Sequence, residues 1–340
     1  MRVLIVTDAW RPQTNGVVTT LEQTIAGIEA LGHEAVVLEP SRFRTLPMPG
    51  YGEIRVSLPP LRVGRHIRAL APDAVHIATE GPLGFAARRW LKRRGLPFTT
   101  SLHTKFPEYV RARTGLPLSL GYAFLRRFHR PAASTLVTTE TQRAELSAWG
   151  LEHLSVWGRG VDVEQFRPRP HRPRPRPVLL YVGRLAVEKN LPAFLDLEHP
   201  GHKVVVGDGP QRAALERRHP DVEFLGYRYG DDLAAAYADA DVFVFPSRTD
   251  TFGLVMLEAM ACGTPVAAYP VTGPRDVVVD GVTGALDEDL GRAVERALAC
   301  DRGACRRHAE ANDWRAVARR FVDDLVPFSP EARGHLAEAA

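Results

Sequence analysis

Cysteine and long apolar runs are scarce in this sequence. Its 340 residues include three cysteines, Cys262, Cys300 and Cys305, and no C-x-x-C pair. This pattern excludes a disulfide framework and a cysteine zinc site, and it suits a reducing cytoplasm. No apolar stretch reaches the roughly 18 residues that a membrane span needs, and the run from Val3 to Val6 is too short for a signal peptide. We therefore expect a cytoplasmic protein that is attached to a membrane surface at most.

The net charge of the chain is small but unevenly distributed. Hydrophobic residues make up 45% of the sequence and charged residues 25%, which is ordinary for folded domains and excludes intrinsic disorder. The net charge is +4, yet residues 1–160 carry +9 and residues 161–340 carry −5. A chain of this length is typical of two domains. A basic front half joined to an acidic back half requires an explanation beyond solubility.

Both halves alternate short β-branched runs with helix-length segments. One such segment, Val17 to Leu31, ends before Gly32, which is typical of a helix C-terminus. The strand-like runs are 3–6, 35–38, 74–77, 97–102 and 134–139, then 177–183, 203–209, 222–226, 241–247 and 264–270. This alternation predicts an α/β protein with two Rossmann-like, doubly wound units. Ligands are then expected beyond the carboxyl ends of the strands, in the cleft between the units.

Between the two sets of runs lies an Arg/Pro-rich segment at 167–177, RPRPHRPRPRP. Closely spaced prolines prevent helix and central strand, so the segment favours a stiff extended linker. A nucleic-acid-binding arm is the alternative. We favour a charged connector, because no aromatic residues lie among the arginines and an α/β unit flanks each side.

The first motif with chemical meaning is VGRLAVEKN at 182–190. A strand ends at Gly183, and Arg184 and Lys189 follow in a loop that is expected to enter a helix. Two cations at a helix N-terminus suit a diphosphate, because the free N–H groups and the helix dipole add to their field. The alternative is a pair of solvated surface cations.

The second motif is SRTDTFGLVMLEAMACGTPV at 247–266. Asp250 precedes a helix expected to begin near Phe252, and Glu258 lies about two turns further on. Carboxylates at these places accept hydrogen bonds from sugar hydroxyls, while the helix N-terminus faces a phosphate. Asp250 could instead be an N-cap. Glu258 sits in an apolar helix and requires a buried partner.

Taken together, GRL, EKN, GDGP and the spacing from Asp250 to Glu258 resemble the retaining GT-B glycosyltransferases that use nucleotide sugars. Four motifs in the right order make this resemblance specific, and it covers nearly the whole chain. It implies an N-terminal acceptor domain at 1–160 and a donor domain at 161–316. It also implies that a helix at about 317–330 packs back on the first domain.

The resemblance also implies roles for individual residues. Arg184 and Lys189 would hold the donor diphosphate, Asp250 the 3- and 4-hydroxyls of the transferred sugar, and Glu258 the ribose. Many family members have Glu where this chain has Asp250. Backbone or side chains of further residues would contact the donor: Gly16, Gly183, Gly207, Gly209, Tyr227, Arg228, Phe252, Gly253 and Leu254.

His103 follows the strand-like run 97–102, so it is expected to point into the predicted cleft. The resemblance implies that it contacts the transferred sugar near the reacting carbon. The alternative is a histidine that merely caps the strand.

The expected mechanism follows from the resemblance. It implies front-face substitution with retention, in which the departing diphosphate helps to accept the proton and Arg184 and Lys189 stabilise its charge. No D-x-D motif follows a strand, because Asp239 and Asp241 precede one. We therefore expect no cofactor and no metal, and activity in the presence of EDTA.

Cations cluster in the first half at residues 88–94 and 126–130, beside apolar residues such as Phe85 and Phe124. Such segments resemble basic amphipathic helices that rest on anionic lipids at the inner face of the plasma membrane. Solvated helix faces are the alternative. The expected partners are a nucleotide-sugar donor, a lipid or saccharide acceptor and an anionic membrane surface, with no nucleic acid.

The donor is less readable from the sequence. The segments PQTNGV, HTKFPEYV and SRTDTFG most resemble GDP-mannose-dependent α-mannosyltransferases, with glucosyl and sulfoquinovosyl lipid synthases close by. GDP-mannose is the first choice and UDP-glucose the second. A sugar-nucleotide epimerase of the same fold and a nucleic-acid-binding protein are alternatives from other classes. The epimerase does not explain the Asp250 to Glu258 spacing, and the nucleic-acid binder does not explain a diphosphate site.

Overall fold

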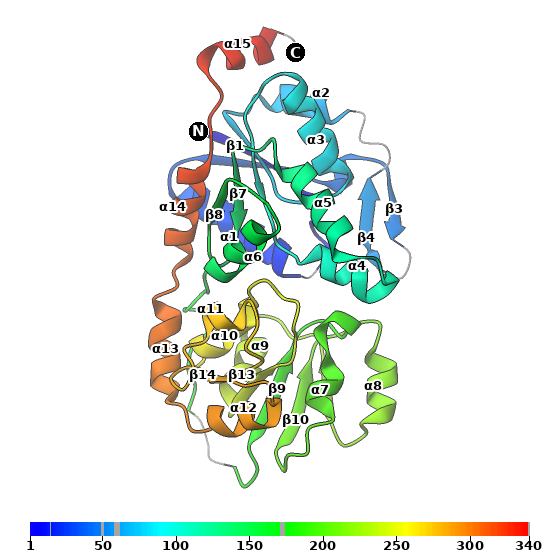
Figure 1. Cartoon of the computed structure of the whole chain (residues 1–340). Helices are drawn as coiled ribbons and strands as arrows, with labels where there is room; N and C mark the ends of the chain where they lie inside the picture. The colour runs from blue at the N-terminus through cyan, green and yellow to red at the C-terminus, as the bar shows by residue number, and fades with distance from the viewer. Residues whose placement is uncertain (14, 49–50, 58–61, 171–173, 339–340) are drawn as a thin grey trace. The chain divides into compact units, whose positions relative to one another are not determined.

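The protein divides into two compact units in a computed structural model that describes residues 1–13, 15–48, 51–57, 62–170 and 174–338 (Figure 1). Unit 1 comprises Met1–Gly158 and Arg315–Ala340, and unit 2 comprises Arg159–Trp314. Among the described residues, no helix combines the length and apolarity needed to cross a membrane.

Unit 1 is built on a six-stranded parallel sheet. The strand order is β2-β1-β5-β6-β7-β8, so the order reverses between β1 and β5. A separate antiparallel pair, β3 and β4, adds a hairpin. The strands are β1 (Arg2–Val6), β2 (Glu34–Leu38), β3 (Thr45–Met48), β4 (Tyr51–Ser57), β5 (Ala74–Ile77), β6 (Thr99–Ser101), β7 (Ser134–Val137) and β8 (Leu154–Val156).

The first helix of unit 1 begins and ends where the sequence supplies caps. The Asn15 side chain accepts hydrogen bonds from the N–H groups of Val17 and Val18 and so starts α1, and Gly32, with φ of 79°, follows its end. The helices are α1 (Gly16–Ala30), α2 (Val63–Leu70), α3 (Pro82–Arg93), α4 (Phe106–Thr114), α5 (Leu118–His129), α6 (Glu140–Ala148), α14 (Trp314–Asp324) and α15 (Pro330–Glu338), with a 3₁₀ turn η1 (Pro40–Arg42).

Unit 2 has a second six-stranded parallel sheet, in the order β11-β10-β9-β12-β13-β14. This is the Rossmann order, with its topological switch point between β9 and β12. The strands are β9 (Val178–Val182), β10 (His202–Val206), β11 (Glu223–Gly226), β12 (Val242–Phe245), β13 (Val266–Ala268) and β14 (Gly284–Leu286).

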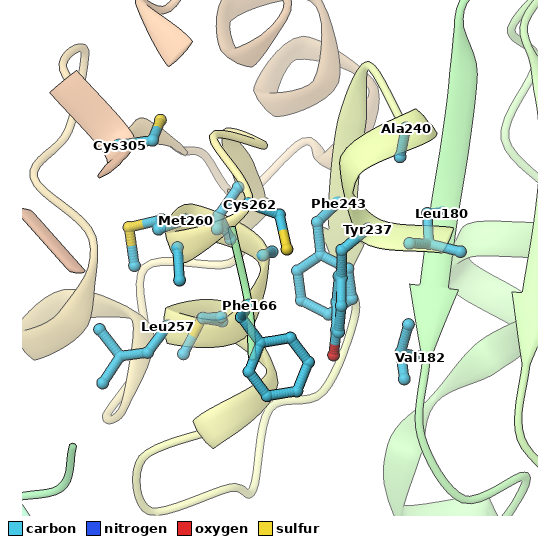
Figure 2. Packing of buried hydrophobic residues seen from close by; sticks show 14 of the residues in the cluster. Phe166, Leu180, Val182, Tyr237, Ala240, Phe243, Leu257, Met260, Cys262 and Cys305 are labelled. Atoms are coloured by element: carbon cyan, nitrogen blue, oxygen red, sulfur yellow. The ribbon is translucent and has the colours of Figure 1, made fainter. Parts of the chain in front are cut away.

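Helices cover both faces of the second sheet, so its strands are buried on both sides. Alternate residues of β9 enter different cores: Leu180 and Val182 pack with Tyr237 and Phe243, as Figure 2 shows, whereas Tyr181 packs on the other side. The helices are α7 (Leu191–Leu195), α8 (Arg212–Arg218), α9 (Gly230–Asp239), α10 (Leu254–Ala261), α11 (Pro274–Val277), α12 (Leu290–Ala297) and α13 (Arg302–Glu310), with a 3₁₀ turn η2 (Val187–Lys189).

The ten strand-like runs of the sequence all correspond to strands, which confirms the α/β prediction. The sequence did not predict β8 and β14, because a serine lies within one and a glycine begins the other, so neither is a continuous β-branched run. It also did not predict the β3–β4 hairpin.

Two expectations about the chain's organisation differ from the structure. The Arg/Pro-rich segment was expected to connect the domains, and its residues 171–173 lie outside the described residues. Its flanks belong to unit 2, where Phe166 is buried against Tyr237 and Arg169 donates to the Asp231 carbonyl oxygen. The helix expected at about 317–330 ends at Asp324, and a new helix begins at Pro330, because Pro327 cannot continue a helix.

Candidate active site

The loops that follow β9 and β12 meet at the switch point of unit 2. The Lys189 Nζ donates to Asp250 Oδ1 at 2.5 Å, with 23% and 16% of the two side chains exposed. Two hydrogen bonds from side chains to the backbone also connect these loops. Asn190 Nδ2 donates to the Pro246 carbonyl oxygen (3.1 Å), and Thr249 Oγ1 donates to the Glu188 carbonyl oxygen (3.3 Å). The structure therefore joins in one ion pair two residues that the sequence assigned to different groups of a ligand.

The second carboxylate oxygen of Asp250 is not satisfied within the protein. Asp250 Oδ2 is buried and accepts no hydrogen bond from the described residues. Leaving a buried acceptor unsatisfied costs about 1–3 kcal/mol, so a ligand or a water is expected to complete this one. Asp250 is also not an N-cap, because Gly253 occupies the cap of α10 and no side chain caps this helix. Both observations favour a ligand hydroxyl as the partner of Oδ2.

Helix α10 begins at Leu254, two residues later than the sequence indicated. The chain reaches it through Gly253, whose φ of 85° favours glycine. A second loop closes over this entry, because a Cβ on Gly273 would lie 3.0 Å from the Phe252 carbonyl oxygen and 3.1 Å from that of Asp250. The N-terminus of α10 thus lies beside the loop that carries Asp250, and a helix N-terminus in general suits an anionic group.

Three glycines proposed to contact a donor have a structural reason of their own. A Cβ on Gly207 would lie 1.9 Å from the Gly183 carbonyl oxygen, and one on Gly209 would lie 2.5 Å from that of Leu185. The Gly183 N–H in turn donates to the Val206 carbonyl oxygen at 3.0 Å. The loops after β9 and β10 therefore pack backbone against backbone at the carboxyl edge of the sheet, and any side chain would separate them.

Glu258 has the buried partner that the sequence required. The Tyr237 hydroxyl donates to Glu258 Oε2 at 2.8 Å. Burial raises the pKa of Glu258 to about 7, although the Tyr237 hydrogen bond acts in the opposite direction. Glu258 thus exchanges a proton near neutral pH, so its carboxyl group can be either a hydrogen-bond donor or a pure acceptor. Sequence reasoning missed Tyr237, because it lies 21 residues away on α9.

The remaining donor residues of unit 2 lie at the same edge of the sheet. The Arg184 carbonyl oxygen accepts from the Tyr181 hydroxyl at 3.0 Å. Tyr227 and Arg228 follow β11 and are exposed, and the Tyr227 ring stacks on Tyr229 with centroids 6.0 Å apart. Lys189 itself lies in the 3₁₀ turn η2, and α7 has five residues. The loop that carries the two cations does enter a helix, but α7 begins only at Leu191, after the left-handed Asn190, and makes little more than one turn.

The other two predicted site residues, Gly16 and His103, belong to unit 1. Gly16 is the exposed first residue of α1, directly after the cap Asn15. His103 follows the carboxyl end of β6, and its Nε2 lies 2.8 Å from Ser101 Oγ. Its ring packs edge-on against Trp157 with centroids 5.8 Å apart. The structure thus places the His103 side chain against the last residue of β6 and against Trp157.

Two doubly wound α/β units of this kind make up the GT-B fold, which the similar solved structures share. Residues 176–300 match the family described as Glycosyl transferases group 1, and residues 14–165 match Glycosyltransferase Family 4. The chain belongs to this glycosyltransferase family.

Two relatives carry the name GDP-mannose-dependent alpha-mannosyltransferase. The one from Mycobacterium tuberculosis is 34% identical over 84% of this chain and 83% of its own length. The one from Mycolicibacterium smegmatis is 32% identical over 95% of this chain and 96% of its own length. Among solved structures, sucrose-phosphate synthase from Thermosynechococcus elongatus is similar with a TM-score of 0.77, covering 95% of this chain and 97% of that chain at 20% identity, which supports the fold.

Proposed function

We propose that the protein is a retaining α-glycosyltransferase that moves mannose from GDP-mannose to a lipid or saccharide acceptor at the cytoplasmic face of the membrane. The names of the two relatives support the donor and the sugar. The observation that carries the proposal is the Lys189–Asp250 pair with its unsatisfied carboxylate oxygen. A cation and a carboxylate side by side match a ligand that presents a diphosphate next to sugar hydroxyls.

In this proposal each group acts on one part of the donor. Lys189 and Arg184 neutralise the diphosphate as it departs, while Asp250 Oδ2 accepts a hydroxyl of the transferred sugar. The ionised form of Glu258 accepts the ribose hydroxyls. Catalysis then depends on positioning and on charge stabilisation of the leaving group, and the departing diphosphate helps to accept the acceptor's proton on the same face.

The donor and the reaction are tested together with the purified full-length chain. GDP-mannose and UDP-glucose are supplied separately, each with and without a lipid extract, and release of nucleotide and labelling of lipid are followed. We expect turnover with GDP-mannose, continued turnover in EDTA and an α-linked product by NMR. Turnover with UDP-glucose alone would identify the second candidate, a glucolipid synthase. Interconversion of sugar nucleotides without transfer would contradict the glycosyltransferase proposal.

An anionic membrane surface is the proposed location of the acceptor. The two basic segments of unit 1 come together in the structure, because the Arg88 Nε on α3 donates to the Phe128 carbonyl oxygen at the end of α5 (2.7 Å). A cavity of about 930 Å³ lies between them, and five cations line it: Arg88, Lys92, Arg126, Arg127 and Arg130. We call these five residues the basic face.

Exposed aromatic residues lie beside the basic face. The Phe85 and Phe124 rings, 37% and 38% exposed, lie 5.5 Å apart on α3 and α5. Cations next to exposed aromatic rings are typical of surfaces that enter the lipid headgroup layer. Co-sedimentation with vesicles of phosphatidylglycerol and phosphatidylcholine tests the location. We expect binding that increases with anionic lipid and weakens with salt, and absence of binding at low salt would contradict it.

A further inference from the structure

Four side chains in unit 1 form a continuous line of hydrogen bonds that ends at His103. Thr99 Oγ1 lies 2.9 Å from His76 Nδ1, and His76 Nε2 lies 3.0 Å from Ser101 Oγ. Ser101 Oγ lies 2.8 Å from His103 Nε2. Both nitrogens of the His76 ring therefore take part, and the line joins the interior of the sheet to a residue at its carboxyl edge.

The fold holds this line rigidly. His76 and Thr99 are fully buried and Ser101 is 1% exposed. His76 on β5 is paired in register with Thr99 on β6, so the parallel sheet itself fixes their separation. The Phe321 ring of α14 packs edge-on against His76 at 4.8 Å, and Trp157 lies 6.2 Å from His76 and 5.8 Å from His103. Aromatic rings thus limit the rotation of both imidazoles.

Because each group in the line has a fixed number of protons, the tautomer of His103 determines the tautomer of His76. A neutral imidazole has one N–H and one lone pair, and a serine hydroxyl has one proton. If His103 Nε2 donates to Ser101, the serine hydroxyl donates to His76 Nε2, and His76 Nδ1 donates to Thr99. If Ser101 donates to His103 instead, every bond reverses. The other acceptor near Ser101 Oγ is the Ala78 carbonyl oxygen, which is more distant at 3.4 Å.

We propose that His76 and Ser101 are positioning residues that hold the His103 imidazole in one tautomer and one orientation. This fixes whether His103 Nδ1 is a donor or an acceptor toward the sugar, because that nitrogen has the opposite role from Nε2. The inference rests on the proposed function and on the role that the resemblance implies for His103, contact with the transferred sugar. His76 and Ser101 would then contribute to the reaction although neither of them contacts the sugar.

The first test separates positioning from stability. Ser101→Ala removes the central hydroxyl, and His76→Gln retains a hydrogen-bond donor and an acceptor in a side chain that cannot titrate. Thr135→Val is the matched control, because it removes a buried hydroxyl from the same sheet that is bonded to Thr100 instead (2.9 Å). We expect Ser101→Ala to lower kcat by about 10- to 100-fold with little change in the donor KM, as loss of an orienting partner does. His76→Gln should retain more activity than His76→Phe, and the melting temperature of Ser101→Ala should match that of the control.

The second test reads the tautomer directly. In protein labelled with ¹⁵N-histidine, the ring nitrogens of His103 are assigned by their loss in His103→Gln. We expect one neutral tautomer in the unchanged protein and in Thr135→Val, and averaged nitrogen shifts in Ser101→Ala. Unchanged shifts together with a kcat equal to that of Thr135→Val would overturn the inference. Absence of sugar transfer from every donor would instead contradict the proposed function, while the nitrogen shifts would still support or overturn the hydrogen-bonded line.

Discussion

The two units place an aspartate next to the switch point of their sheets and use it in opposite ways. In unit 1, Asp8 follows β1, and its carboxylate accepts the N–H groups of Leu83 (2.9 Å) and Gly84 (3.3 Å) and the Thr79 hydroxyl (3.0 Å). It therefore caps the N-terminus of α3. In unit 2, Asp250 follows β12, where one oxygen accepts from Lys189 and the other has no partner among the described residues.

This difference distinguishes a carboxylate that stabilises the fold from one that is available to bind a ligand. The surroundings of Asp8 are filled, since a Cβ on Gly81 would lie 2.3 Å from its carboxyl carbon. The protein satisfies Asp8 completely and Asp250 only in part. An acid at a switch point thus indicates a ligand site when its own fold leaves an oxygen unsatisfied.

The largest expected effect is the loss of activity on Lys189→Ala. The variant removes a cation from the proposed diphosphate site, so we expect kcat/KM to fall by about 10³-fold, near the upper range for one stabilising group. The matched control is Lys203→Ala, because Lys203 also belongs to unit 2 but donates to the Leu195 and Leu197 carbonyl oxygens. If Lys189→Ala loses no more activity than Lys203→Ala, the assignment of Lys189 is wrong.

The next effect concerns stability and belongs to unit 1. Asp8→Ala leaves two backbone N–H groups of α3 and the Thr79 hydroxyl without their acceptor, so we expect a loss of about 2 kcal/mol in the free energy of unfolding. Glu34→Ala, which breaks an exposed ion pair with Arg2, should cost much less, because solvent screens exposed pairs. Urea denaturation measures both. A large rise in the donor KM at unchanged stability would instead assign Asp8 to a ligand site.

An effect of similar size, but confined to higher pH, is expected from Glu258→Gln. Burial raises the pKa of Glu258 to about 7 from its ordinary value of 4.5, so the folded protein binds an extra proton between these values. Stability therefore falls as pH rises from about 4.5 to 7. Glutamine retains an acceptor for Tyr237 but has no charge.

We expect the glutamine variant to gain about 2 kcal/mol relative to the unchanged protein at pH 8 and nothing at pH 4. Its donor KM should rise at pH 8, since the ionised acceptor is missing. Urea denaturation at both pH values is the measurement. Equal stability differences at pH 4 and pH 8 would show that Glu258 is ionised normally in the folded protein.

Much of the fold was predictable, because it depends on local patterns. Runs such as 177–183 are apolar and bounded by glycine or proline, and strand β9 forms there. The Asp250 to Glu258 spacing likewise indicated a helix with a carboxylate before it and another inside it. Helix caps such as Asn15 are signals of the same kind, since they act over three or four residues.

The contacts that define the site were not predictable from the sequence. Lys189 and Asp250 are 61 residues apart, and only the order β9 next to β12 brings their loops together. Tyr237 and His76 are buried polar groups whose partners come from other elements. A sequence pattern indicates that such a residue needs a partner, whereas the packing of the sheet decides which residue supplies it.

The central claim is that the sugar of the donor satisfies Asp250 Oδ2. Calorimetric binding of GDP-mannose and of GDP to the unchanged protein and to Asp250→Ala tests it most directly. We predict that the unchanged protein binds GDP-mannose more tightly than GDP. Asp250→Ala should reduce this preference by about 10-fold, as loss of a hydrogen bond to a charged group does, and should leave the affinity for GDP nearly unchanged. An equal loss of affinity for both ligands, or no loss for either, would contradict it.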